Sequence, residues 1–278
     1  MKIGFIGAGR VGSAAAYTIL LLLNPDELAL VDIAEDLAKG EALDLSHAAH
    51  ALGKSVEVAG GSDYELLEGS DLIIVSAGAA RKPGMSRLDL LQKNAGIMKS
   101  IAERLKPVLG EAPIMVVTNP VDLTTYILWR NLGIPRNRIM GMGGVLDTAR
   151  LRSLRKGEGG GIVLGEHGDG MFVLGADRSL EEKVRAAAME VIRRKGATVY
   201  GPAASIYRLA KAILTDSREV LPVSAILDGE YGLRNIAIGV PARLGRSGII
   251  EIIELEEARE RLLESARKLR ERLREIGY

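Results

Sequence analysis

The sequence predicts an α/β protein, with a doubly wound parallel sheet of six strands in residues 1–144 and a second, α+β domain in residues 145–278. Two observations indicate this arrangement. Up to about residue 144, short apolar runs alternate with helical patterns, as they do in the β-α units of a parallel sheet. Beyond that point the apolar runs and helices no longer alternate regularly, which favours a separate α+β unit.

The predicted strands of the first domain are six apolar runs: residues 2–6, 28–31, 55–59, 71–77, 113–118 and 138–142. Helices are predicted at residues 13–23, 40–52, 88–105 and 121–132. Six strands complete a doubly wound nucleotide-binding sheet. The second domain is predicted to contain a helix ending near residue 155, a glycine-rich turn (156–161), a hairpin (162–174), one long helix (180–214), two apolar runs (220–227 and 235–240) and a charged terminal helix (255–276).

Composition narrows the functional classes. The chain has 278 residues, is 47% hydrophobic and carries a net charge of +1, so neither nucleic acid nor an anionic membrane is expected as its main partner. The apolar run 14–23 is too short to span a bilayer and no signal peptide precedes the first strand, which predicts a cytoplasmic protein. The lack of cysteine excludes thiolate catalysis and Cys-ligated zinc, and no metal site is expected. The lack of cysteine, the single glutamine and the excess of arginine over lysine together favour a thermophilic source.

A glycine turn, Gly7-Ala8-Gly9-Arg10-Val11-Gly12, joins the first strand to the first helix. Its glycines permit a tight turn, close approach of a pyrophosphate and close helix packing, while the helix N-terminus attracts the negative charge. Asp32 ends the second strand, 20 residues after Gly12, where an acid can bind the ribose hydroxyls of NAD. Because Ile33 offers no charge for a 2′-phosphate, NADP is expected only as a weaker substitute. The alternative is a nucleotide-free α/β domain.

Candidate catalytic groups occur in two segments of the second domain. His167, one of three histidines, lies in the turn Gly165-Glu166-His167-Gly168-Asp169, which suits proton transfer. Asp147 and Arg150 share one face of a helix, so a carboxylate can orient His167 while a guanidinium binds an anion. Each segment also has an alternative interpretation: His167 is an ordinary turn residue, and Asp147 and Arg150 are a solvated ion pair on a helix. The other histidines, His47 and His50, are expected to pack or to contact another subunit rather than bind metal.

Two further loops follow strands at the edge of the sheet where ligands bind. The loop of residues 76–87 contains Arg81, Lys82 and Arg87 beside proline and glycine, as a mobile lid over an anionic substrate would. Asn119 places an amide at the same edge. A solvated basic loop and an ordinary turn are the alternatives.

With these motifs in order along nearly the whole chain, the sequence resembles the lactate and malate dehydrogenase family, most closely the archaeal type of malate dehydrogenase. The resemblance implies a Rossmann sheet, an NAD-dependent oxidoreductase that interconverts malate and oxaloacetate in the tricarboxylic acid cycle, and a homodimer or homotetramer. The implied catalytic residues are His167, Asp147 and Arg87, and the implied substrate-binding residues are Arg81, Arg87, Arg150 and Asn119. The implied cofactor-binding residues are Gly7, Gly9, Arg10, Val11, Gly12, Asp32, Ala77, Gly78, Asn94, Thr118 and Asn119.

In the family's pattern, His167 transfers the proton and Asp147 orients its imidazole. Arg150 binds the substrate C1 carboxylate, and Arg87 polarises the carbonyl. Arg81 stands where malate-specific members carry arginine and lactate-specific members glutamine. Residues 156–161 and 169–180 are shorter than the family's pattern, which affects the substrate-side helices and their subunit contacts. The alternatives are a lactate or broad 2-hydroxyacid dehydrogenase, and a non-catalytic dinucleotide-binding sensor. An NAD-dependent glycosidase would need a cysteine ligand that this chain lacks.

Overall fold

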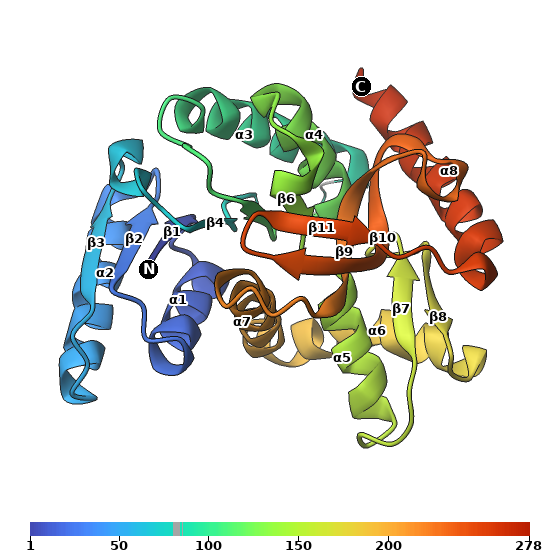
Figure 1. Cartoon of the computed structure of the whole chain (residues 1–278), viewed down its shortest axis with the longest axis horizontal. Helices are drawn as coiled ribbons and strands as arrows, with labels where there is room; N and C mark the ends of the chain where they lie inside the picture. The colour runs from blue at the N-terminus through green and yellow to red at the C-terminus, as the bar shows by residue number, and fades with distance from the viewer. Residues whose placement is uncertain (80–83, 85) are drawn as a thin grey trace.

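The computed structural model describes residues 1–79, 84 and 86–278. Its first half forms a parallel sheet (Figure 1), made of β1 (Lys2–Ile6), β2 (Glu27–Val31), β3 (Glu57–Gly61), β4 (Leu72–Val75), β5 (Ile114–Val116) and β6 (Ile139–Gly141). The strand order is β3-β2-β1-β4-β5-β6, and every neighbouring pair is parallel. The predicted six-stranded doubly wound sheet is therefore confirmed.

Helices cover both faces of this sheet. They are α1 (Arg10–Leu22), α2 (Glu35–Ala51), α3 (Arg87–Leu105) and α4 (Val121–Leu132). Figure 1 shows α3 and α4 on one side of the sheet and α1 on the other. Because both faces are covered, β1, β2 and β4 are buried over nearly their whole length, and this explains why their sequences are continuous apolar runs.

The sheet continues into the second half of the chain, because Gly141 of β6 pairs with Ser224 of β9 in an antiparallel ladder. The strands of this half are β7 (Ile162–Gly165), β8 (Met171–Leu174), β9 (Val220–Asp228), β10 (Arg234–Gly245) and β11 (Gly248–Ile252). Its helices are α5 (Gly144–Leu154), α6 (Glu181–Lys195), α7 (Tyr200–Leu214) and α8 (Arg259–Glu275). Beyond β9 the order is β10, β7 and β8, with β11 paired to β10. The predicted domain boundary after residue 144 falls at the start of α5 and stays a prediction.

Two predictions for the second half are wrong. The single helix predicted at residues 180–214 is two helices, because Gly196 ends α6 in the left-handed region, with a φ of 88°, and α7 begins only at Tyr200. The apolar run predicted at 235–240 is too short, because it is only the first half of β10, which extends to Gly245 before the chain returns as β11. In the first half, β3 lies two residues later than predicted.

Helices from the two halves lie side by side, since α7 packs against α1, which starts at the glycine turn (Figure 1). The apolar face of α7, which includes Ile206, Leu209 and Ile213, is completely buried. Burial of this kind is the main favourable contribution to folding and ties the second half to the nucleotide-side helix. Within the described ranges, no helix combines the length and the hydropathy that crossing a membrane requires.

Candidate active site

The glycine turn after β1 has the geometry of a phosphate cradle. Gly7 has a φ of 109°, and a Cβ there would come within 2.5 Å of the Ala77 nitrogen. A Cβ at Gly12 would lie 2.0 Å from the Gly7 carbonyl oxygen, so the helix can approach the strand this closely only with glycine. At Gly9 a Cβ would meet nothing within 4 Å, and no side chain caps the first turn of α1. The N–H groups at this helix end can therefore receive an anion.

Asp32 is held at the end of β2 by two main-chain donors. The Ala8 N–H donates to its Oδ2 at 2.8 Å and the Ala34 N–H to its Oδ1 at 2.9 Å. Gly9, Asp32, Ala77 and Gly78 are among the residues that line a cavity of about 540 Å³. An open glycine turn, a fixed carboxylate and a cavity of this size fit a dinucleotide such as NAD. The neighbouring Ile33 is 91% exposed and brings no positive charge.

The predicted cofactor residues outside the glycine turn and Asp32 lie in, or contact, the loops after β4 and β5. The Thr118 hydroxyl donates to the Ala77 carbonyl at 2.7 Å, and a Cβ at Gly78 would lie 2.3 Å from the Thr118 methyl group. Asn94 is buried: its amide donates to the Asn119 carbonyl at 2.6 Å, and its oxygen accepts from the Ala79 N–H at 2.8 Å. Asn94 therefore joins the two loops. The side chains of Arg10 and Asn119 are exposed, and that of Val11 is half-buried.

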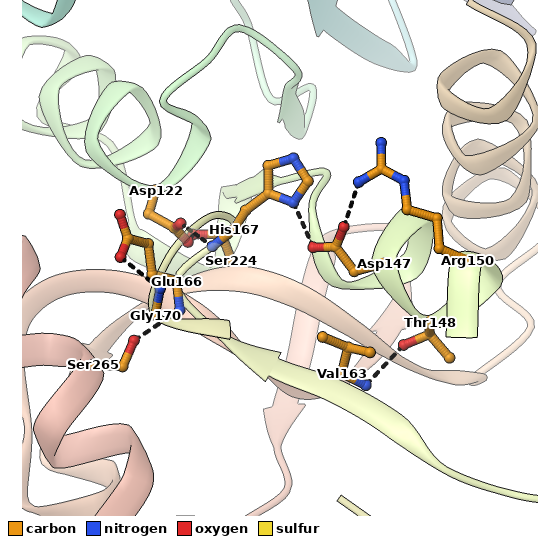
Figure 2. Close-up of polar contacts among 10 residues, drawn as sticks. All are labelled: Asp122, Asp147, Thr148, Arg150, Val163, Glu166, His167, Gly170, Ser224 and Ser265. Atoms are coloured by element: carbon orange, nitrogen blue, oxygen red, sulfur yellow. Dashed lines mark hydrogen bonds and ion pairs between the residues drawn. The ribbon is translucent and has the colours of Figure 1, made fainter. Parts of the chain in front are cut away.

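His167, Asp147 and Arg150 form one hydrogen-bonded cluster (Figure 2). Nδ1 of His167 lies 2.5 Å from Oδ2 of Asp147, and Arg150 Nη1 donates to Oδ1 of the same carboxylate at 2.7 Å. The Asp147 side chain is 1% exposed, whereas those of His167 and Arg150 are each 15% exposed. In Figure 2 the imidazole and the guanidinium project to the same side of Asp147. The structure thus brings together the two segments that the sequence singled out, with Asp147 between a proton carrier and a cation.

The environment of His167 favours its protonated form. Burial lowers the pKa of the imidazole, but the negative charge and hydrogen bond of Asp147 outweigh this, aided by the charge of Asp122 and opposed by that of Arg150, so the pKa is raised overall. With Nδ1 held by Asp147, the other ring nitrogen remains for a substrate. The arrangement can therefore carry a proton and hold it in a fixed direction.

The predicted lid is only partly described. Arg81 lies outside the described residues, and Arg87 is described only as the first residue of α3, without its side chain. The start of α3 is fixed by a capping box, in which Ser86 Oγ accepts from the Asp89 N–H and the Asp89 carboxylate accepts from the Ser86 N–H, both at 3.0 Å. This box anchors the end of the loop.

The sequence did not predict the residues that accept hydrogen bonds from the main chain of the His167 turn. Asp122 Oδ2 accepts from the His167 N–H at 2.7 Å, and Ser265 Oγ of α8 accepts from the Glu166 N–H at 2.9 Å. Glu166 is buried and pairs with Arg272 of α8. The only signal for Asp122 is its place in the first turn of α4, where an acid ordinarily indicates a helix-dipole partner in solvent.

The two remaining histidines lie on α2, and both are exposed within this chain, so the predicted packing role is not found here. Nδ1 of His50 lies 2.8 Å from the Ser46 carbonyl oxygen. A contact with another subunit stays a prediction. In the described part of the chain, no three His, Cys, Asp or Glu side chains are grouped so that they could hold a metal ion.

Two family models match the chain. Residues 1–141 match the model for the lactate/malate dehydrogenase NAD binding domain, and residues 174–277 match that for the lactate/malate dehydrogenase alpha/beta C-terminal domain. The chain belongs to the lactate/malate dehydrogenase family. The family resemblance predicted from the sequence is therefore confirmed, as is NAD as the cofactor of its N-terminal domain.

Similar members of the family include both kinds of enzyme. Malate dehydrogenase from Archaeoglobus fulgidus is 52% identical over 294 residues, covering 100% of both chains. The solved structure of malate dehydrogenase from that organism in complex with NADH matches with a TM-score of 0.95, again over 100% of both chains. L-lactate dehydrogenase 1 from Clostridium acetobutylicum is 40% identical over 310 residues, covering 99% of this chain and 98% of the relative.

Proposed function

We propose that the chain is an NAD-dependent malate dehydrogenase, which interconverts (S)-malate and oxaloacetate. The observation that carries the proposal is the cluster of His167, Asp147 and Arg150, in which one buried carboxylate contacts both a proton carrier and a guanidinium. This combination suits a substrate with a carboxylate next to a carbonyl or hydroxyl group. The 52% identity to malate dehydrogenase from A. fulgidus supports malate as that substrate.

The residues of the glycine cradle and Asp32 would hold the cofactor. The open helix end at Gly9 would receive the pyrophosphate, and Asp32 would accept hydrogen bonds from the ribose of the adenosine half. Asn94 and Thr118 hold the loop after β4, whose residues Ala77, Gly78 and Ala79 line the cavity. When bound, NADH supplies the hydride for reduction of the carbonyl carbon.

His167 supplies the proton. In the reducing direction its imidazolium donates a proton to the carbonyl oxygen of oxaloacetate, and in the oxidising direction the neutral ring accepts the hydroxyl proton of malate. Asp147 stabilises the charged ring and fixes its orientation. Arg150 binds the C1 carboxylate through its guanidinium donors, and Arg87 polarises the carbonyl once the loop closes. Asn119, exposed after β5, would contact the substrate, as the family resemblance implies.

We assign to Arg81 the preference for a dicarboxylate over a monocarboxylate substrate. Arg150 accounts for the carboxylate that all 2-oxoacids share, so a further cation on the lid has a use when the substrate carries a second negative charge. The second candidate function is a lactate or broad 2-hydroxyacid dehydrogenase, which the 40% identity to the lactate dehydrogenase from C. acetobutylicum supports. A dinucleotide-binding sensor would have no use for the cluster of His167 and Arg150.

The proposal is tested by mixing the purified wild-type protein with NADH and oxaloacetate. One NADH should be consumed for each (S)-malate formed, as measured by absorbance and by chiral chromatography of the product. Binding of NADH without turnover on any 2-oxoacid would instead identify a sensor. Formation of (R)-malate would contradict the assigned positions of His167 and Arg150.

Asp32 should determine the preference for NAD. The double substitution Asp32→Ser with Ile33→Arg removes a carboxylate that would repel a 2′-phosphate and adds a cation at a position that is 91% exposed. We expect the ratio of kcat/KM for NADPH to that for NADH to rise by roughly 10-fold or more. Ile33→Arg alone, which leaves the two hydrogen bonds of Asp32 in place, is the control and should change the ratio less. A wild-type protein that already prefers NADPH would contradict the prediction.

We also propose a homodimer or homotetramer. The family resemblance implies this assembly, and exposed side chains such as Tyr17 on α1 (43%), Leu43 on α2 (59%) and Met189 on α6 (64%) are available for contact with a second copy. Sedimentation analysis of the wild-type protein would measure the assembly. The cytoplasmic location, the role in the tricarboxylic acid cycle and the thermophilic source stay predictions from the sequence.

A further inference from the structure

Asp122 is a buried carboxylate for which the proposed reaction has no direct use. It lies in the first turn of α4 and is 3% exposed. Its Oδ1 accepts from the Ser224 hydroxyl of β9 at 2.6 Å, and its Oδ2 accepts from the His167 N–H at 2.7 Å (Figure 2). One side chain therefore connects a helix of the first half, a strand of the second half and the turn that carries the imidazole.

A buried acid is costly to the fold unless its charge is compensated, so its presence here calls for a role. Burial raises the pKa of Asp122 to about 6, although the hydrogen bonds from Ser224 and from His167 N–H lower it. The carboxyl is therefore ionised above about pH 6, and its place in the first turn of α4 puts the charge at the positive end of the helix.

We infer that Asp122 is a positioning residue for His167, because its carboxylate, secured by Ser224, holds the main chain of the catalytic turn from the side opposite the Asp147 contact of the ring. The inference rests on the proposed function, since it assigns a reason for holding His167 in place. A side chain that only filled space would not need to engage both carboxylate oxygens.

Asp122 also contributes charge. The ring of His167 is faced by Asp147 and Arg150 from α5 and by Asp122 from α4. The adjacent Glu166 is paired with Arg272 of α8, which also lies 3.9 Å from Asp169. Of the groups facing the ring, the two aspartates favour its protonated form and Arg150 opposes it. Removing the charge of Asp122 should thus lower the pKa of His167.

Three substitutions separate the geometric contribution from that of charge. Asp122→Ala leaves the His167 N–H without its acceptor and should lower kcat for oxaloacetate reduction by roughly 100-fold, the scale expected for a misplacement of about 1 Å. Asp122→Asn keeps an acceptor oxygen and should recover most of that loss, whereas Ser224→Ala should cost only a few-fold. KM for NADH should stay near the wild-type value in all three. Thr125→Val, on the same helix, is the matched control, because its buried hydroxyl has no hydrogen-bond partner in the described structure.

The deciding readout does not depend on turnover. NMR titration of the three histidines, assigned with His167→Asn, should show a lower pKa for His167 in Asp122→Asn and unchanged values for His47 and His50. For kcat/KM with oxaloacetate, the decline at high pH should then begin at a lower pH than in the wild type, because reduction needs the protonated ring.

An unchanged His167 pKa in Asp122→Asn would overturn the inference, and so would an Asp122→Ala protein with kcat within threefold of the wild type. If Asp122→Ala does not fold, the Asn variant decides. A wild-type protein that reduces no 2-oxoacid would refute the proposed function instead, and the NMR result would still stand.

Discussion

Replacement of His167 by asparagine should lower turnover by roughly 100-fold or more, because a positioned acid/base group contributes at least that much to the rate. Asparagine keeps the size and polarity of the position but cannot carry the proton. The NADH dissociation constant should stay near the wild-type value, since His167 lies in the turn between β7 and β8 and not among the residues that line the cavity at Gly9 and Asp32.

Stopped-flow and steady-state rates with oxaloacetate, together with fluorescence titration of NADH, measure both quantities. His50→Gln is the matched control, because this exposed histidine on α2 lies outside the candidate site and its loss should leave the rate unchanged. Oxaloacetate reduction at the wild-type rate in His167→Asn would remove the imidazole from the mechanism.

Replacement of Arg81 by glutamine should lower kcat/KM for oxaloacetate by at least about 100-fold, since each 1.4 kcal/mol is tenfold and a charge-assisted pair contributes more than that. Pyruvate reduction should hold or rise. With pyruvate bound, closure of the loop would leave Arg81 desolvated and unpaired, and an unmatched buried charge costs several kcal/mol. We therefore expect Arg81 to discriminate partly by penalising the wrong substrate.

Lys82→Gln is the control for Arg81, because it removes one positive charge from the same loop without touching the position that the family resemblance assigns to specificity. It should change the ratio of oxaloacetate to pyruvate activity by only a few-fold. An Arg81→Gln protein with the wild-type ratio would remove the main support for a dicarboxylate substrate and leave Arg87 as the lid cation that matters.

The sequence was sufficient wherever a local pattern determines the structure. The glycines at 7, 9 and 12 between a strand and a helix predict the cradle, since their chemistry depends on neighbours along the chain. The spacing of Asp147 and Arg150 likewise predicts that both face one way, and the structure adds the contact with His167. The break at Gly196, which the prediction of one long helix missed, also has a local signal, because three basic residues followed by glycine are typical of a helix C-terminus.

Contacts between distant segments could not be predicted in this way. The pairing of β6 with β9 joins Gly141 to Ser224, and no local pattern in either segment specifies the other. The burial of Asp122 could not be predicted for the same reason. An acid in the first turn of a helix is ordinarily solvated, and Asp122 is buried because β9 and the His167 turn pack over it. The contacts that Asp122 and Ser224 make behind the His167 turn are therefore visible only in the folded chain.

The most direct test of the account compares oxaloacetate with pyruvate in the wild-type protein, each at several concentrations with NADH held constant and with a blank that lacks the 2-oxoacid. The account predicts that kcat/KM for oxaloacetate exceeds that for pyruvate by at least about 100-fold, with no NADH consumed in the blank. A kcat/KM for pyruvate equal to or greater than that for oxaloacetate would contradict it, and the chain would then be a lactate or broad 2-hydroxyacid dehydrogenase.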